Sequence, residues 1–82
     1  MTHATHAAIA ARIVAEAGQD LDAIRKGLRA AYIASPEYAR FRLADETCRY
    51  NDEWVAADEA DQAVYRIYWD ARVAAYDAAA QR

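Results

Sequence analysis

The chain has 82 residues, enough for one domain, and a formal net charge of −3. Its hydrophobic fraction is 56%, and it contains two glycines, one proline and one cysteine. This composition argues against a disordered chain and a turn-rich all-β fold, and a single cysteine excludes an intramolecular disulfide.

Targeting and membrane signals are missing from the sequence. No apolar run approaches the roughly 20 residues that a membrane span needs. The N-terminus has neither the basic start nor the apolar stretch of a signal peptide. Together with the lone Cys48, these features predict a reducing, cytoplasmic location.

Alanine supplies 23 of the hydrophobic residues. It favours helices but buries little area. A chain of this length hides only about 60–65% of its unfolded surface on folding. We therefore expect a lean core that gains further burial by dimerising or by docking on a partner.

The first two helices are predicted from their caps. One runs from about Thr5 to Ala17, with residues 1–5 frayed, and Gly18 can end it in the left-handed conformation. Asp20 can cap the next, which continues to about Ala34. Its apolar stripe has the three- and four-residue spacing of one helical face: Leu21, Ile24, Leu28, Ala31 and Tyr32.

Ser35-Pro36-Glu37 is the clearest helix start in the chain, with a capping serine, a proline at the first helical position and then an acid. The third helix is predicted to run from Pro36 to about Ala57. A fourth, capped by Asp58, would continue to about Ala80, although the two could also form one kinked helix. The sequence thus predicts a single all-α domain over residues 1–82, a small compact bundle of three or four helices with the last two longest.

The fourth helix is apolar on two opposite sides. One side is a stripe of small and aliphatic residues: Ala60, Val64, Ile67, Ala71, Ala74 and Ala78. The other carries Tyr65, Trp69 and Tyr76, with Arg72 among them. A small domain can hardly bury both sides. The aromatic side is therefore either core packing against the first two helices or a second interface with a partner or another copy.

The sequence holds no recognisable catalytic set. Ser35 is the only serine and is explained as a helix cap, and Cys48 falls on an apolar side of the third helix, as a buried thiol would. The two histidines, His3 and His6, are interpreted as part of a floppy N-terminus rather than as metal ligands. No zinc or di-iron spacing and no glycine-rich phosphate loop occurs. We expect a protein that is not an enzyme and holds no metal or cofactor.

A basic segment offers one alternative function. Arg25, Lys26 and Arg29 follow the Gly18 turn, and Ile24, six residues after Gly18, fits the usual helix-turn-helix spacing. The turn itself is acidic at Asp20 and Asp22. A small DNA-binding regulator is therefore the second hypothesis, and contact with nucleic acid is not the favoured one.

The most unusual segment is residues 45–61, which has seven acidic residues against Arg49 alone. On one continuous helix, the acids at 45/52 and 46/53 would form stripes bordered by Tyr50 and Trp54. They are either a solvated helix face or a surface that steers a basic partner in and anchors it with aromatic rings. The residues expected to bind that partner are Asp45, Glu46, Tyr50, Asp52, Glu53, Trp54, Asp58, Glu59 and Asp61.

These patterns lead to one main hypothesis about function. The chain is expected to be a non-enzymatic inhibitor or regulator that occupies a basic surface on another protein. A phage or mobile-element inhibitor of a host nucleic-acid-binding defence complex, such as a restriction or CRISPR complex, is one form of it. A third possibility is a structural subunit that assembles, as a homodimer for example, through the sides of the fourth helix.

Overall fold

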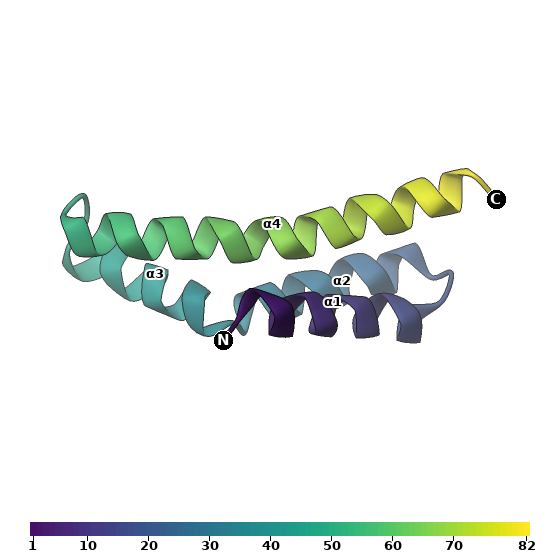
Figure 1. Ribbon diagram of the computed structural model, residues 1–82, viewed down its shortest axis with the longest axis horizontal. Helices are drawn as coiled ribbons and strands as arrows, with labels where there is room; N and C mark the ends of the chain where they lie inside the picture. The colour runs from purple at the N-terminus through teal and green to yellow at the C-terminus, as the bar shows by residue number, and fades with distance from the viewer.

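The computed structural model describes all 82 residues and contains four α-helices and no strands. They are α1 (His3–Ala17), α2 (Leu21–Ile33), α3 (Pro36–Thr47) and α4 (Asp52–Ala80). Helix α4 runs the whole length of the molecule, with the α1–α2 hairpin along its C-terminal half and α3 along its N-terminal half (Figure 1). The bundle measures 47 × 20 × 18 Å. The predicted all-α bundle with a long final helix is confirmed.

Three of the expected helix boundaries are confirmed by their caps. The Asp20 carboxylate accepts a hydrogen bond from the Ala23 amide at 3.0 Å, and Ser35 Oγ accepts one from the Tyr38 amide at 3.2 Å. Gly18, which follows α1, has a φ of 62°, in the left-handed region. Helix α1 starts at His3, two residues earlier than expected, because Thr2 Oγ1 caps it by accepting from the Thr5 amide.

The expected boundary between the last two helices is wrong. Helix α3 ends at Thr47 instead of Ala57 and, with 12 residues, is the shortest of the four, so only α4, with 29, is long. The chain leaves the helix through Tyr50, whose φ is 71°. Asn51, and not Asp58, then caps α4 by accepting from the Trp54 amide at 3.0 Å.

The hydrophobic core lies between α1, α2 and α4 and is made of Ala10, Ile24, Leu28, Val64 and Tyr68. Helix α4 buries a stripe at alternating three- and four-residue spacing, Ala57, Asp61, Val64 and Tyr68. This stripe lies between the two apolar sides expected from the sequence. It shares Val64 with the small-residue side, of which Ala71 also packs against the core, whereas the aromatic side is not part of the core cluster. Only 10 of the 82 residues are buried, which confirms that the core is lean.

None of the four helices combines the length and the apolarity needed to cross a membrane, even though α4 has 29 residues.

Candidate functional site

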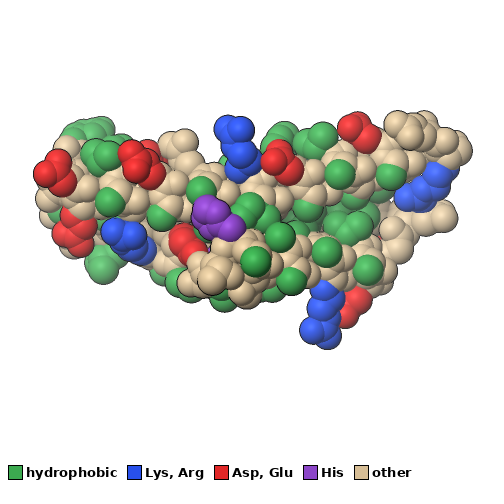
Figure 2. Space-filling view, viewed as in Figure 1, with side chains coloured by type: hydrophobic (Ala, Val, Ile, Leu, Met, Phe, Trp, Pro, Cys, Tyr) green, Lys and Arg blue, Asp and Glu red, His purple; other side chains and the backbone are tan.

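The acidic residues gather at the end of the molecule where α3 turns into α4. Asp and Glu side chains lie on both helices there, with hydrophobic side chains exposed between them (Figure 2). Because the chain reverses between Cys48 and Asn51, positions 45 and 52 lie on different helices. The acidic stripes expected on one continuous helix therefore do not exist. The acids form a cap around one end, which we call the acidic end, defined as residues 43–59.

Asp45 ties the acidic end together. Its carboxylate accepts hydrogen bonds from Arg49 Nε at 3.1 Å and Nη2 at 3.0 Å, and from Trp54 Nε1 at 3.0 Å. The bonds from Arg49 and then Trp54 hold the pKa of Asp45 below its usual value. Asp45 is therefore a local structural link, and its charge is already matched by Arg49.

The two aromatic residues expected to bind a partner differ in exposure. Trp54 is half-buried, with its ring centroid 6.0 Å from that of Phe41 and 5.2 Å from that of Tyr50. Tyr50 is 75% exposed. The Tyr50 backbone has a positive φ, which costs a non-glycine residue of the order of 1 kcal/mol. Its side chain extends into solvent from this turn. Of the two, Tyr50 is the available contact.

The other acidic residues fall into three groups. Glu46, Asp52, Glu53 and Glu59 are exposed and belong to no ion pair. Asp58 is partly exposed and accepts a hydrogen bond from Gln62 Nε2 at 3.1 Å. Asp61 is only 6% exposed, which removes it from the expected partner surface.

Asp61 belongs to the interior because its position falls on the buried stripe of α4. Tyr32 Oη donates a hydrogen bond to Asp61 Oδ1 at 2.8 Å. Burial raises the pKa of the Asp61 carboxyl, and the bond from Tyr32 only partly opposes this. Burial and the nearby carboxylate also raise the pKa of Tyr32. A carboxylate with a raised pKa destabilises the fold at neutral pH.

Asp61→Asn is therefore expected to stabilise the protein by about 1 kcal/mol at pH 7, since the amide oxygen still accepts from Tyr32 without a buried charge. The folded protein holds the Asp61 proton to higher pH than the unfolded chain does, so the penalty grows as pH rises through the raised pKa. The gain should thus shrink towards pH 3. Urea unfolding at both pH values measures it, and equal gains at both would contradict this origin.

Tyr65, Trp69 and Tyr76 form an aromatic ladder along one flank of α4, with Arg72 among them. The rings of Tyr65 and Trp69 are stacked, with centroids 6.2 Å apart and an interplanar angle of 13°. The Arg72 guanidinium lies 5.2 Å from the Trp69 ring centroid and 5.3 Å from that of Tyr76. Tyr65 and Trp69 are 47% and 45% exposed. The ladder is neither wholly core nor wholly solvated.

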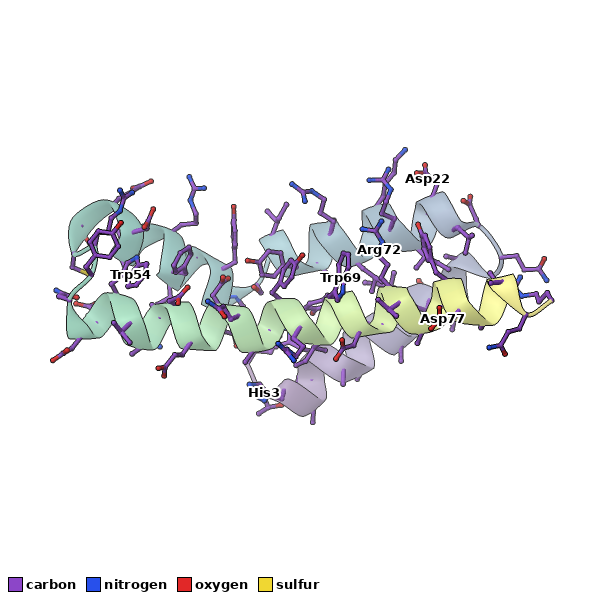
Figure 3. All side chains as sticks on the ribbon, turned by 90° about the horizontal axis from the view of Figure 1, so that it is seen from above. His3, Asp22, Trp54, Trp69, Arg72 and Asp77 are labelled. Atoms are coloured by element: carbon purple, nitrogen blue, oxygen red, sulfur yellow. The ribbon has the colours of Figure 1, made fainter.

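A groove of about 180 Å³ lies between α2 and the part of the ladder formed by Tyr65, Trp69 and Arg72. Trp69 and Arg72 project from α4 on the side of α2 (Figure 3). Arg25 and Arg29 line the opposite wall. Arg25 pairs with Asp22 at 2.8 Å, as does Lys26 at 2.9 Å, whereas Arg29 and Arg72 belong to no ion pair. The basic residues of α2 and the aromatic residues of α4 therefore share one surface.

A buried polar cluster surrounds His6 and was not predicted from the sequence. This side chain was expected in a frayed terminus but is 1% exposed. His6 Nδ1 lies 2.8 Å from Tyr68 Oη, and Nε2 lies 2.9 Å from Glu37 Oε1. Burial alone would raise the pKa of Glu37, but its own backbone amide and His6 outweigh this and lower it. The cluster joins α1, α3 and α4. His6 precedes the buried Ala10 by one helical turn, and this spacing was the only sequence signal that His6 lies on the buried face of α1.

Other candidate chemistry finds little support in the geometry. No group of three or more His, Cys, Asp or Glu side chains is placed to hold a metal ion. Cys48 is the half-buried residue that follows α3, and not a buried thiol within a longer helix as expected. The residues brought together are ion pairs, hydrogen-bonded acids and aromatic rings.

The fold and these surfaces define a small four-helix protein with an acidic end and an arginine–aromatic groove. No protein-family model, no curated protein and no solved structure matches the chain.

Proposed function

We propose that this chain is a non-enzymatic binding protein that inhibits or regulates another protein by occupying a basic surface on it. The contact surface would be the acidic end. Nucleic-acid-binding complexes carry basic surfaces of the kind required, and a defence complex that a phage or mobile element must block is one example. The proposed mechanism is steric and electrostatic competition without turnover.

One observation carries this proposal: exposed hydrophobic side chains stand among unpaired carboxylates at the acidic end. Leu43 is 62% exposed, Tyr50 75% and Val55 42%. The acids around them include Glu46 and Glu59, which have no ion-pair partner. Apolar contacts supply binding energy, while the unpaired charges raise the rate of association with a basic surface.

Glu46 and Glu59 are the residues to change in a test. Asp52 and Glu53 lie in the first turn of α4, where a negative charge also stabilises the helix. Glu46 and Glu59 have no such role. Glu46→Lys/Glu59→Lys should leave the helical circular dichroism unchanged and abolish recovery of a partner from nuclease-treated lysate of the host organism.

The matched control is Asp70→Lys/Asp77→Lys, which makes the same change in net charge at exposed positions of α4 outside the acidic end; Asp77 lies towards its C-terminal end (Figure 3). This control should recover the same partner as the wild type. Equal loss with both variants would show a nonspecific charge effect and contradict the proposal. Recovery of DNA alone, lost on changing Arg25 and Arg29, would instead favour a DNA-binding regulator.

A further inference from the structure

Helix α4 has a second heptad-like stripe that α2 covers only in part: the Tyr76 hydroxyl donates to the Leu21 carbonyl at 3.2 Å, and the Tyr65 ring lies 5.2 Å from that of Tyr32. The stripe consists of Asp58, Gln62, Tyr65, Trp69, Arg72 and Tyr76, at spacings that alternate between four and three residues. The buried stripe of α4 has the same periodicity and packs against the other three helices. Apolar and aromatic residues at this spacing form the seams of coiled coils. We call this partly exposed set the outer stripe.

The charges of the outer stripe are arranged so that it complements itself. Asp58 lies towards its N-terminal end and Arg72 towards its C-terminal end, about 21 Å apart at 1.5 Å per residue. Tyr65 is midway between them. When two such stripes run in opposite directions with the two-fold axis at Tyr65, Asp58 of each copy faces Arg72 of the other, and the two Tyr65 side chains meet at the centre. A parallel arrangement would instead place like charges together.

Arg72 is held in one orientation and has no ion-pair partner within its own chain. Its guanidinium lies over the Trp69 and Tyr76 rings, which restrains its orientation, and no carboxylate of its own chain pairs with it. A stacked guanidinium keeps its N–H edge free to bind a carboxylate. Arg29 lines the same groove and could reach the same acid. Asp58 likewise has a hydrogen bond to Gln62 but no cationic partner.

The same ladder is poorly suited to stacking nucleobases. Proteins that bind single strands offer free aromatic faces to the bases. Here Tyr65 is stacked against Trp69, and Arg72 lies over the Trp69 ring. A base would have to displace one of these contacts, whereas a second protein surface can pack against the exposed ring edges.

We propose that the outer stripe is the contact surface for a second copy of this chain, packed antiparallel about a two-fold axis near Tyr65. Such an interface uses the same patch on both copies, and this is the commonest symmetry among soluble oligomers. Tyr65 and Trp69 lie near its centre and Arg72 flanks them, and tyrosine, tryptophan and arginine are the residue types that dominate binding energy at interfaces. The dimer adds buried area that the lean core of one chain lacks.

Charge swaps test both the contact and its direction. Sedimentation velocity over a concentration series should show wild-type dimers at micromolar concentrations. Asp58→Arg and Arg72→Glu should each weaken dimerisation about tenfold or more, because the two-fold axis turns each change into two like-charge contacts. The double variant Asp58→Arg/Arg72→Glu should dimerise like the wild type, since both pairs are then reversed. Asp70→Arg, on α4 outside the stripe, should have no effect.

An equal mixture of the two single variants provides a second readout. One copy then carries arginine at both positions and the other carries acids at both, so we expect a heterodimer with near wild-type affinity. A wild-type protein that stays monomeric at several hundred micromolar would overturn the proposal. So would a double variant as weak as the singles, because rescue requires position 58 to face position 72.

Discussion

His6→Ala is expected to destabilise the fold by about 3 kcal/mol, the sum of a cavity and of polar groups left without partners. The imidazole is 1% exposed, and both of its nitrogens are hydrogen-bonded. Its removal leaves the Tyr68 hydroxyl, on a residue that is 3% exposed, without this partner. Denaturant unfolding followed by circular dichroism measures the loss.

His3→Ala is the matched control for this measurement. His3 is on the same helix but is exposed and projects away from the bundle (Figure 3). A surface substitution of this kind changes stability by no more than about 0.5 kcal/mol. If His6→Ala behaved in the same way, the cluster of His6, Glu37 and Tyr68 would not hold the helices together in solution.

Gly27→Leu should lower the free energy of unfolding by a comparable amount, about 3 kcal/mol, because the new side chain overlaps with α1. A Cβ atom at Gly27 would lie 2.8 Å from Ile13 Cγ2, closer than real Cβ contacts. The missing side chain of Gly27 is thus what lets α1 and α2 approach each other. Leucine must push the two helices apart, and this disturbs the core that they share with α4. A shift of the urea midpoint without a change in slope would show the loss.

Gly27→Ala and Gly18→Ala separate sterics from backbone conformation. At Gly27, alanine overlaps with Ile13 but gains about 1 kcal/mol of helix propensity, so its net effect should be small. At Gly18, nothing lies within 4 Å of the added Cβ, but the φ of 62° costs an alanine roughly 1–2 kcal/mol. A Gly27→Leu variant as stable as the wild type would contradict the close approach.

The parts of the fold that could be predicted are those with strong local signals. Asp20 and Ser35 are residue types that favour the N-cap position, and each caps a helix with its side chain. Gly18 allows the left-handed conformation that ends α1. The turn at residues 48–51 has no glycine or proline, and its left-handed residue is Tyr50. The only sequence signal for the start of α4 is Asn51, a capping residue followed by two acids. This signal was weaker than the helical periodicity of the flanking residues, which predicted one helix through the turn.

The candidate site was harder to predict because polar residues are assigned to the surface by default. His6 and Asp61 both occupy positions on apolar stripes, and both are buried against polar partners contributed by distant segments. Periodicity shows which face of a helix a residue lies on. It cannot show that another helix will place Tyr32 or Glu37 within hydrogen-bonding distance of that residue. The meeting of Arg29 with Arg72 in one groove likewise depends on how α2 packs against α4.

The buried apolar residues are unevenly distributed between α3 and the other three helices. All five residues of the hydrophobic core cluster belong to α1, α2 and α4, whereas α3 buries only Ala44. Segments with few buried apolar contacts open at a lower free-energy cost than the whole protein unfolds. Helix α3 is therefore expected to open at a lower free-energy cost than the three-helix core, and such opening would shift its part of the acidic end, residues 43–47, relative to the part that belongs to α4.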